Sequence, residues 1–151
     1  MRVLILALIA ILLVAPLPAH AQNAPEAPQP SVQLPPELDR VLRDYESRYR
    51  MGGDTLAALF APDGFVLSGG LPPVRGRAAI ARHYGRAGGP LMLRAIAYAT
   101  EGDVGYIIGG YRYPPQTTDM GKFTLTLRRD ASGYWLIYSD MDNANARPRQ
   151  P

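Results

Sequence analysis

The chain contains no cysteine among its 151 residues. Disulfides, thiolate zinc sites and iron–sulfur clusters are therefore excluded, and the fold must be held together by its apolar core alone. Histidine is also scarce, because only His20 and His83 are present and His20 lies in the N-terminal segment discussed below. A two-histidine zinc motif is excluded once that segment is removed. We predict no metal site and no cofactor.

The chain also lacks a strong charge of either sign. Sixteen Lys and Arg oppose 13 Asp and Glu, which gives a formal net charge of +3. No run of cationic residues interleaved with aromatic residues occurs. Such runs are what nucleic-acid-binding proteins use to reach phosphates and to stack on bases. We therefore predict no nucleic-acid partner.

A long hydrophobic run is missing as well. The apolar run over residues 3–14 has 12 residues, whereas a membrane-spanning helix needs about 20. Arg2 precedes the run, two prolines follow it, and Ala19-His20-Ala21 places small residues at the two positions that a signal peptidase reads. We predict that residues 1–21 are a cleaved signal peptide, with an uncleaved anchor as the alternative. The mature protein would then be periplasmic or secreted, without membrane contact.

The remaining chain is predicted to form a tether, one domain and a tail. Residues 22–36 are rich in Pro, Ala and Gln, so they bury little and should form an extended tether. Residues 147–151 should form a flexible tail. The domain is predicted to span residues 37–146, a length sufficient for one apolar core.

Hydrophobic periodicity predicts helices first and strands afterwards. Apolar residues recur at three- and four-residue steps from Leu38 to Tyr49, and from Leu91 the period changes to two. We expect helices over about 36–50, 55–60 and 77–84, a short strand over 65–68, and four strands over about 91–100, 104–113, 120–130 and 133–142. This order indicates an α+β fold, with helices on one face of an antiparallel sheet.

Four segments carry a resemblance to a known family: Tyr49–Phe60, Asp63–Phe65, Val74–Ile80 and Gly133–Asp140. In this order they are similar to the nuclear transport factor 2-like superfamily, which includes SnoaL-like polyketide cyclases and ketosteroid isomerases. The resemblance implies a curved antiparallel sheet wrapped around N-terminal helices, a cystatin-like cone with an open mouth. It also implies a homodimer formed through the outer face of the sheet. The superfamily mixes enzymes with binding modules, so the resemblance implies no single activity.

Two aspartates in the last predicted strand are the first candidates for a site. The resemblance implies an acid–base aspartate in this strand, so Asp140 and Asp142 are both candidates, without a choice between them. Strict alternation along the strand places them on one face with Leu136 and Tyr138. The alternative interpretation is a solvated strand end, because exposed carboxylates are common there.

Tyrosines supply the other candidates, since the chain has nine of them. The isomerase branch of the superfamily pairs its carboxylate with a tyrosine hydrogen-bond donor, and Tyr49 on the first helix is the candidate for that catalytic role. The aromatic residues predicted to contact a ligand in the cone are Tyr45, Phe65, Tyr84, Tyr98, Tyr111 and Tyr138. The alternative is that these are half-buried packing residues whose hydroxyls reach water.

Three functions remain open from the sequence. The first is an exported protein that binds a small apolar or amphipathic molecule in a cone-shaped apolar pocket. The second is an isomerase, cyclase or dehydratase with an aspartate general base and a tyrosine donor. The third is a structural dimer with no usable cavity. A carboxylate deep in an apolar pocket with a raised pKa would favour catalysis.

Overall fold

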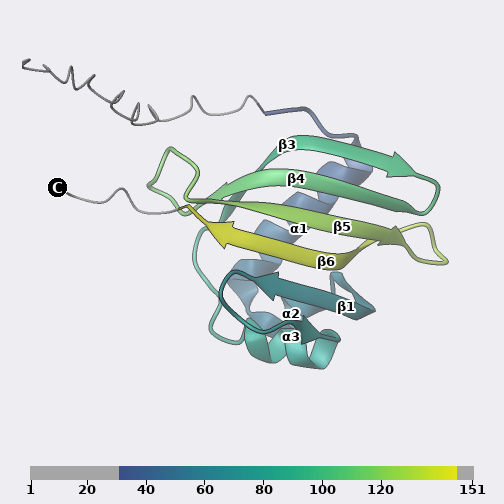
Figure 1. The fold of residues 1–151 in the computed structure, drawn as a ribbon, viewed down its shortest axis with the longest axis horizontal. Helices are drawn as coiled ribbons and strands as arrows, with labels where there is room; N and C mark the ends of the chain where they lie inside the picture. The colour runs from purple at the N-terminus through teal and green to yellow at the C-terminus, as the bar shows by residue number, and fades with distance from the viewer. Residues whose placement is uncertain (1–30, 146–151) are drawn as a thin grey trace, which may run out of the picture.

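The computed structural model describes residues 31–145 (Figure 1). The predicted signal peptide, residues 22–30 of the predicted tether and the predicted tail lie outside these residues. Along the described chain the elements are α1 (Pro36–Met51), α2 (Gly53–Ala57), β1 (Phe60–Ser68), β2 (Val74–Arg75), α3 (Arg77–His83), β3 (Met92–Glu101), β4 (Val104–Arg112), β5 (Gly121–Arg129) and β6 (Trp135–Ala144).

The six strands form one sheet in the order β2-β1-β6-β5-β4-β3. Strands β3 to β6 are a meander of antiparallel neighbours, as the sequence predicted, and β1 adds to β6 in parallel. Figure 1 shows α1 crossing behind the sheet, with α2 and α3 beside β1. The predicted α+β class, with N-terminal helices on one face of a mostly antiparallel sheet, is confirmed.

Helix α1 has one apolar stripe, and this stripe is buried. Leu38, Val41, Leu42 and Tyr45 follow the three- and four-residue step and are all buried. Acidic residues occupy the first turn and arginines the last, which complements the helix dipole. Gly52 ends the helix with a φ of 105°, a conformation that glycine adopts without steric cost. The buried stripe is part of the core that lies between the helices and the inner face of the sheet.

Strand β1 is longer than the sequence predicted. Phe60, expected at the end of the second helix, instead begins β1, is fully buried and pairs with Ile137 of β6. The register of β1 against β6 shifts between Phe60 and Phe65, where Pro62 interrupts regular pairing. Burial between the sheet and the helices therefore overrides the local helical pattern at Phe60.

A bulge in β6 changes which side chains face the helices. Leu127 pairs with Ile137 and Thr126 with Ser139, so Tyr138 is an extra residue in β6. Ile137 and Asp140 are consequently both directed inward, with exposures of 0% and 3%. The sequence predicted strict alternation, which grouped Tyr138 with Asp140 on one face. That prediction is wrong, because the extra residue shifts the alternation by one position.

The short helices α2 and α3 approach each other closely at Gly53. A Cβ atom at this position would lie 2.1 Å from the carbonyl oxygen of Ala81 in α3. We expect Gly53→Ala to destabilise the domain by about 1–3 kcal/mol, because helix backbone and not a flexible side chain must move. Urea denaturation measures this change.

Gly88→Ala is the matched control for this variant. A Cβ atom there meets nothing within 4 Å, and Gly88 does not have a positive φ. Its effect on the free energy of unfolding should stay within about 0.5 kcal/mol. Equal midpoints for the two variants would contradict the close packing of α2 on α3.

Candidate functional site

A cavity of about 180 Å³ lies between α1, the end of α3 and the inner face of the sheet. Its apolar wall consists of Leu91, Leu93, Phe123 and Leu125. Its polar groups are the hydroxyl of Ser68, two carboxyls of β6 and five tyrosine hydroxyls. The carboxyls belong to Asp140 and Asp142, and the tyrosines are Tyr45, Tyr49, Tyr84, Tyr111 and Tyr113.

Asp140 is a polar residue buried in the core, with 3% of its surface exposed. Its Oδ2 accepts hydrogen bonds from the hydroxyls of Tyr45, at 2.7 Å, and Tyr84, at 3.1 Å. The two hydroxyl oxygens are also 3.1 Å apart. Each hydroxyl has one proton, so when both donate to Asp140 their mutual contact is a close approach and not a third hydrogen bond.

The burial of Asp140 raises the pKa of its carboxyl to about 6. Desolvation is the largest cause, and the negative charge of Asp142 raises the pKa further. The hydrogen bonds from Tyr45 and Tyr84 act in the opposite direction, because they stabilise the ionised form. Asp140 therefore changes its protonation state near neutral pH, as few aspartates do.

The two tyrosines bonded to Asp140 stay protonated. Burial, followed by the charge of Asp140, raises the pKa of Tyr45 and of Tyr84 well above the ordinary value of 10.0. Both hydroxyls are thus fixed as donors at physiological pH. They connect α1, the residue after α3, and β6 at the inner end of the cavity.

Asp142 contributes a second carboxylate to the same cavity. Its Oδ1 is fully buried, and no donor within residues 31–145 makes a hydrogen bond to it. Its backbone carbonyl accepts from the N–H of Gly69, at 3.0 Å, which anchors this part of β6 to the loop after β1. A buried acceptor without a partner is costly, and it disfavours the ionised form less only where the rest of the carboxylate is solvated or bonded from the cavity that Asp142 lines.

The other three tyrosines form an aromatic wall. The hydroxyls of Tyr49 and Tyr113 are 3.2 Å apart and share one hydrogen bond. The ring of Tyr113 also packs against Tyr111, with centroids 6.0 Å apart, and against Tyr49 at 6.3 Å. Burial raises the pKa of Tyr113 and of Tyr111, so these hydroxyls also stay neutral.

No family model matches the sequence, and no curated protein matches it either. Solved structures do match. A ketosteroid isomerase-like protein from Erwinia carotovora is 15% identical with a TM-score of 0.59, covering 72% of this chain and 94% of its own. A nuclear transport factor 2-like protein of unknown function from Shewanella oneidensis is 17% identical with a TM-score of 0.56, covering 70% and 95%.

Nuclear transport factor 2 from Cryptosporidium parvum is also similar, at 15% identity with a TM-score of 0.52, covering 76% of this chain and all of its own. The chain has the nuclear transport factor 2-like fold. The expectation from sequence is confirmed at the level of fold, in which ketosteroid isomerase-like and cystatin-like proteins share the same architecture. Identities this low show the fold alone, so the function of this chain must be argued from its own site.

Within the nuclear transport factor 2-like fold, six of the nine predicted site residues line one cavity. These are Asp140, Asp142, Tyr49, Tyr45, Tyr84 and Tyr111. They come from α1, the end of α3, β4 and β6, so only the folded chain brings them together. Tyr113 also lines the cavity and was not predicted as a site residue, although it follows Tyr111 by two residues and period-two alternation places both on one face.

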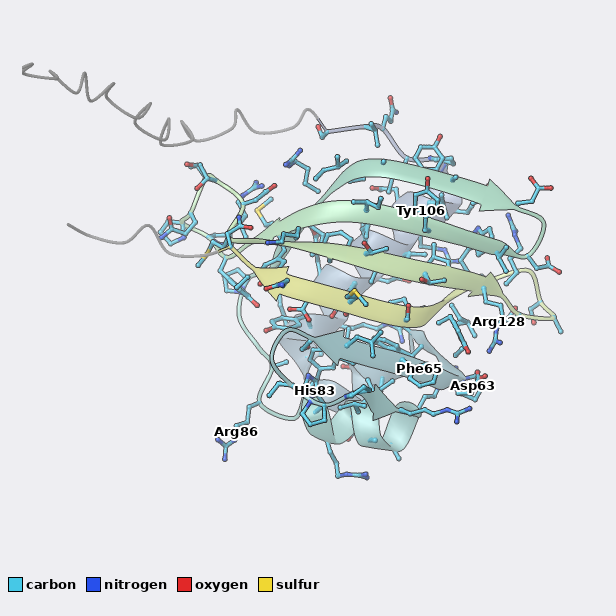
Figure 2. The ribbon with its side chains drawn as sticks, in the orientation of Figure 1. Asp63, Phe65, His83, Arg86, Tyr106 and Arg128 are labelled. Atoms are coloured by element: carbon cyan, nitrogen blue, oxygen red, sulfur yellow. The ribbon has the colours of Figure 1, made fainter. Side chains whose placement is uncertain are left out.

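Phe65, Tyr98 and Tyr138, which the sequence placed around the ligand, do not line this cavity. The bulge in β6 turns Tyr138 to the outer side, where its ring packs edge-on against Phe65 with centroids 5.8 Å apart. Figure 2 shows Phe65 near Asp63 and Arg128 on the side of the sheet opposite α1. Tyr98 lies towards the far end of the edge strand β3 and is 37% exposed.

Residues 31–145 contain no cluster of three His, Asp or Glu side chains arranged to hold a metal ion. Over the same residues, no helix has the length and apolar character required to cross a bilayer.

The raised pKa of Asp140 predicts a pH-dependent stability. Its folded-state pKa of about 6 exceeds the ordinary 3.8, so the native state holds this proton more tightly than the unfolded chain does. The contribution of this group to the free energy of unfolding is therefore fully present below about pH 3.8. It falls by roughly 3 kcal/mol as the pH rises to about 6. Asp140→Asn should remove this loss, as measured by urea denaturation between pH 4 and pH 7.

Asp103→Asn, in the exposed turn between β3 and β4, is the control and should keep the wild-type pH dependence. Parallel stability curves for wild type and Asp140→Asn would contradict a buried carboxyl that titrates near pH 6.

Proposed function

We propose that this protein is exported and binds a small molecule in the cavity bounded by the tyrosines and by Asp140 and Asp142. The observation that carries the proposal is the cavity itself, in which apolar side chains surround the carboxyls of Asp140 and Asp142. Apolar walls with a few convergent polar groups are the usual composition of a ligand site. The export part rests on the segment of residues 1–21.

The size of the cavity limits what it holds. Its volume of about 180 Å³ is close to that of an apolar cavity of about 150 Å³ that accepts benzene, and below the roughly 300–1,000 Å³ usual for drug-sized ligands. The cavity therefore favours a ligand with about one ring, or a short chain, inside the protein. A larger ligand would have to extend through the open side.

An acid–base enzyme of the isomerase, cyclase or dehydratase kind is the second candidate. It is favoured by the carboxyl of Asp140, whose pKa of about 6 suits a general base near neutral pH. The hydroxyls of Tyr45 and Tyr84 already donate to Asp140, so neither is free to stabilise an oxyanion. Tyr49 and Tyr113 share one hydrogen bond and thus retain one free proton, which makes this pair the candidate donor.

Ligand binding is tested on protein recovered from the periplasmic or extracellular fraction after expression with residues 1–21 present. We expect native mass spectrometry to show a mature chain that begins at Gln22 and retains a small-molecule adduct. Asp142→Asn should lose the adduct, whereas the exposed Asp103→Asn should keep it. A leader that stays attached would contradict export. Binding in this cavity would be contradicted if both variants retained the adduct equally. It would also be contradicted if wild type and both variants carried no adduct.

We also propose that the chain forms a homodimer through the outer face of the sheet. Val104, Tyr106 and Ile108 alternate along β4 and are 55%, 39% and 39% exposed, and Met141 of β6 is 54% exposed. Thr124 of β5 pairs with both Ile108 and Met141, so these side chains share one face across three strands. Figure 2 shows Tyr106 on the side of the sheet away from α1. Apolar patches of this kind commonly mark interfaces.

Sedimentation velocity tests this interface. Wild type should sediment as a dimer, and Ile108→Lys should shift it towards monomer, because an unpaired charge would be buried between the sheets. Met51→Lys, at the exposed end of α1, is the control and should remain dimeric. A monomeric wild type, or a dimer unaffected by Ile108→Lys, would contradict the proposal.

A further inference from the structure

The residues that line the cavity carry negative charge and no positive charge. Asp140 and Asp142 are both among them, and none of the other lining residues is a lysine, arginine or histidine. Ten of the twelve are neutral, and the hydroxyls of Tyr45, Tyr84, Tyr111 and Tyr113 stay protonated because burial raises the pKa of each. The two carboxylates repel an anionic ligand, and no cationic side chain in the lining offsets that repulsion.

Within residues 31–145, two hydroxyl protons of the cavity are committed to Asp140, and none is committed to Asp142. The hydroxyl protons of Tyr45 and Tyr84 are used on Oδ2 of Asp140, and Tyr49 and Tyr113 use one proton between them. Oδ1 of Asp142 is left fully buried without a donor from residues 31–145. The carboxylate of Asp142 lines the cavity, so it favours a ligand with an N–H or O–H group, and a charged N–H makes the stronger bond to a carboxylate.

The tyrosine rings add a surface suited to a cation. Tyr49, Tyr111 and Tyr113 form a continuous cluster with ring centroids 6.0 to 6.3 Å apart, and Tyr45 stacks on Tyr49 at 6.4 Å. The faces of aromatic rings are electron-rich and attract ammonium groups within about 6 Å. The carboxylates and the ring faces surround the same small cavity, and both favour a positively charged ligand.

We propose that the ligand of this cavity is a small organic ammonium ion, a primary or secondary amine in its protonated form bearing about one ring of apolar carbon. Its N–H groups bond the carboxylate of Asp142, its charge faces both carboxylates and the tyrosine rings, and its apolar part lies against Leu91, Leu93 and Leu125. This assignment rests on the proposed function, that the cavity binds a small molecule. It adds the chemical class of that molecule.

The test compares three probes of one shape on the mature wild-type chain at pH 7.5 by isothermal titration calorimetry. The probes are cyclohexylammonium, cyclohexanol and cyclohexanecarboxylate, which differ in charge and not in ring size. We expect cyclohexylammonium to bind roughly tenfold or more tightly than cyclohexanol, since a hydrogen bond to a charged group is worth that much. Cyclohexanecarboxylate should show no binding.

A variant locates the effect at Asp142. Asp142→Asn should bring the affinity for cyclohexylammonium down to near that for cyclohexanol, whereas the exposed Asp103→Asn should keep the wild-type ratio. Tighter binding of cyclohexanol or cyclohexanecarboxylate to wild type would overturn the ammonium assignment and leave the proposed function standing. Failure of all three probes to bind would count against both. The comparison of probes on wild type decides the question even where Asp142→Asn does not fold.

Discussion

The structure depends on one buried interaction, the carboxyl of Asp140 held by the hydroxyls of Tyr45 and Tyr84. A buried carboxylate is costly unless it is hydrogen-bonded, so the fold keeps Asp140 only because two donors reach it. These donors come from α1 and from the residue after α3, while Asp140 belongs to β6. One side chain thereby links the long helix, the short helices and the centre of the sheet. The same bonds define the inner end of the cavity.

Much of the fold could be predicted from sequence because its elements have strong periodicity. The apolar stripe from Leu38 to Tyr45 and the period-two pattern after Leu91 are visible in the chain, and both elements form as expected. Phe60 and the parallel pairing of β1 with β6 could not be predicted in this way. They arise from burial between distant segments, which no local pattern records.

The site was predictable only in part, for a related reason. Asp140 and Tyr45 could be selected by residue type and by resemblance, and the folded chain brings them within 2.7 Å. One extra residue in β6 was enough to move Tyr138 to the opposite face, where it packs with Phe65. A bulge has no reliable signature in a single sequence, so faces assigned by alternation fail beyond it. The buried, unpartnered oxygen of Asp142 is visible only in three dimensions.

The central feature of this protein is the carboxyl of Asp140, buried and bonded by two tyrosines at the end of the cavity. The direct measurement is an NMR titration of its side-chain carboxyl carbon in wild type and in Tyr45→Phe. We expect a midpoint near pH 6 in wild type, and a higher midpoint in Tyr45→Phe because a donor to the ionised form is lost. A wild-type midpoint at the ordinary aspartate value near pH 3.8, unchanged in Tyr45→Phe, would contradict the account.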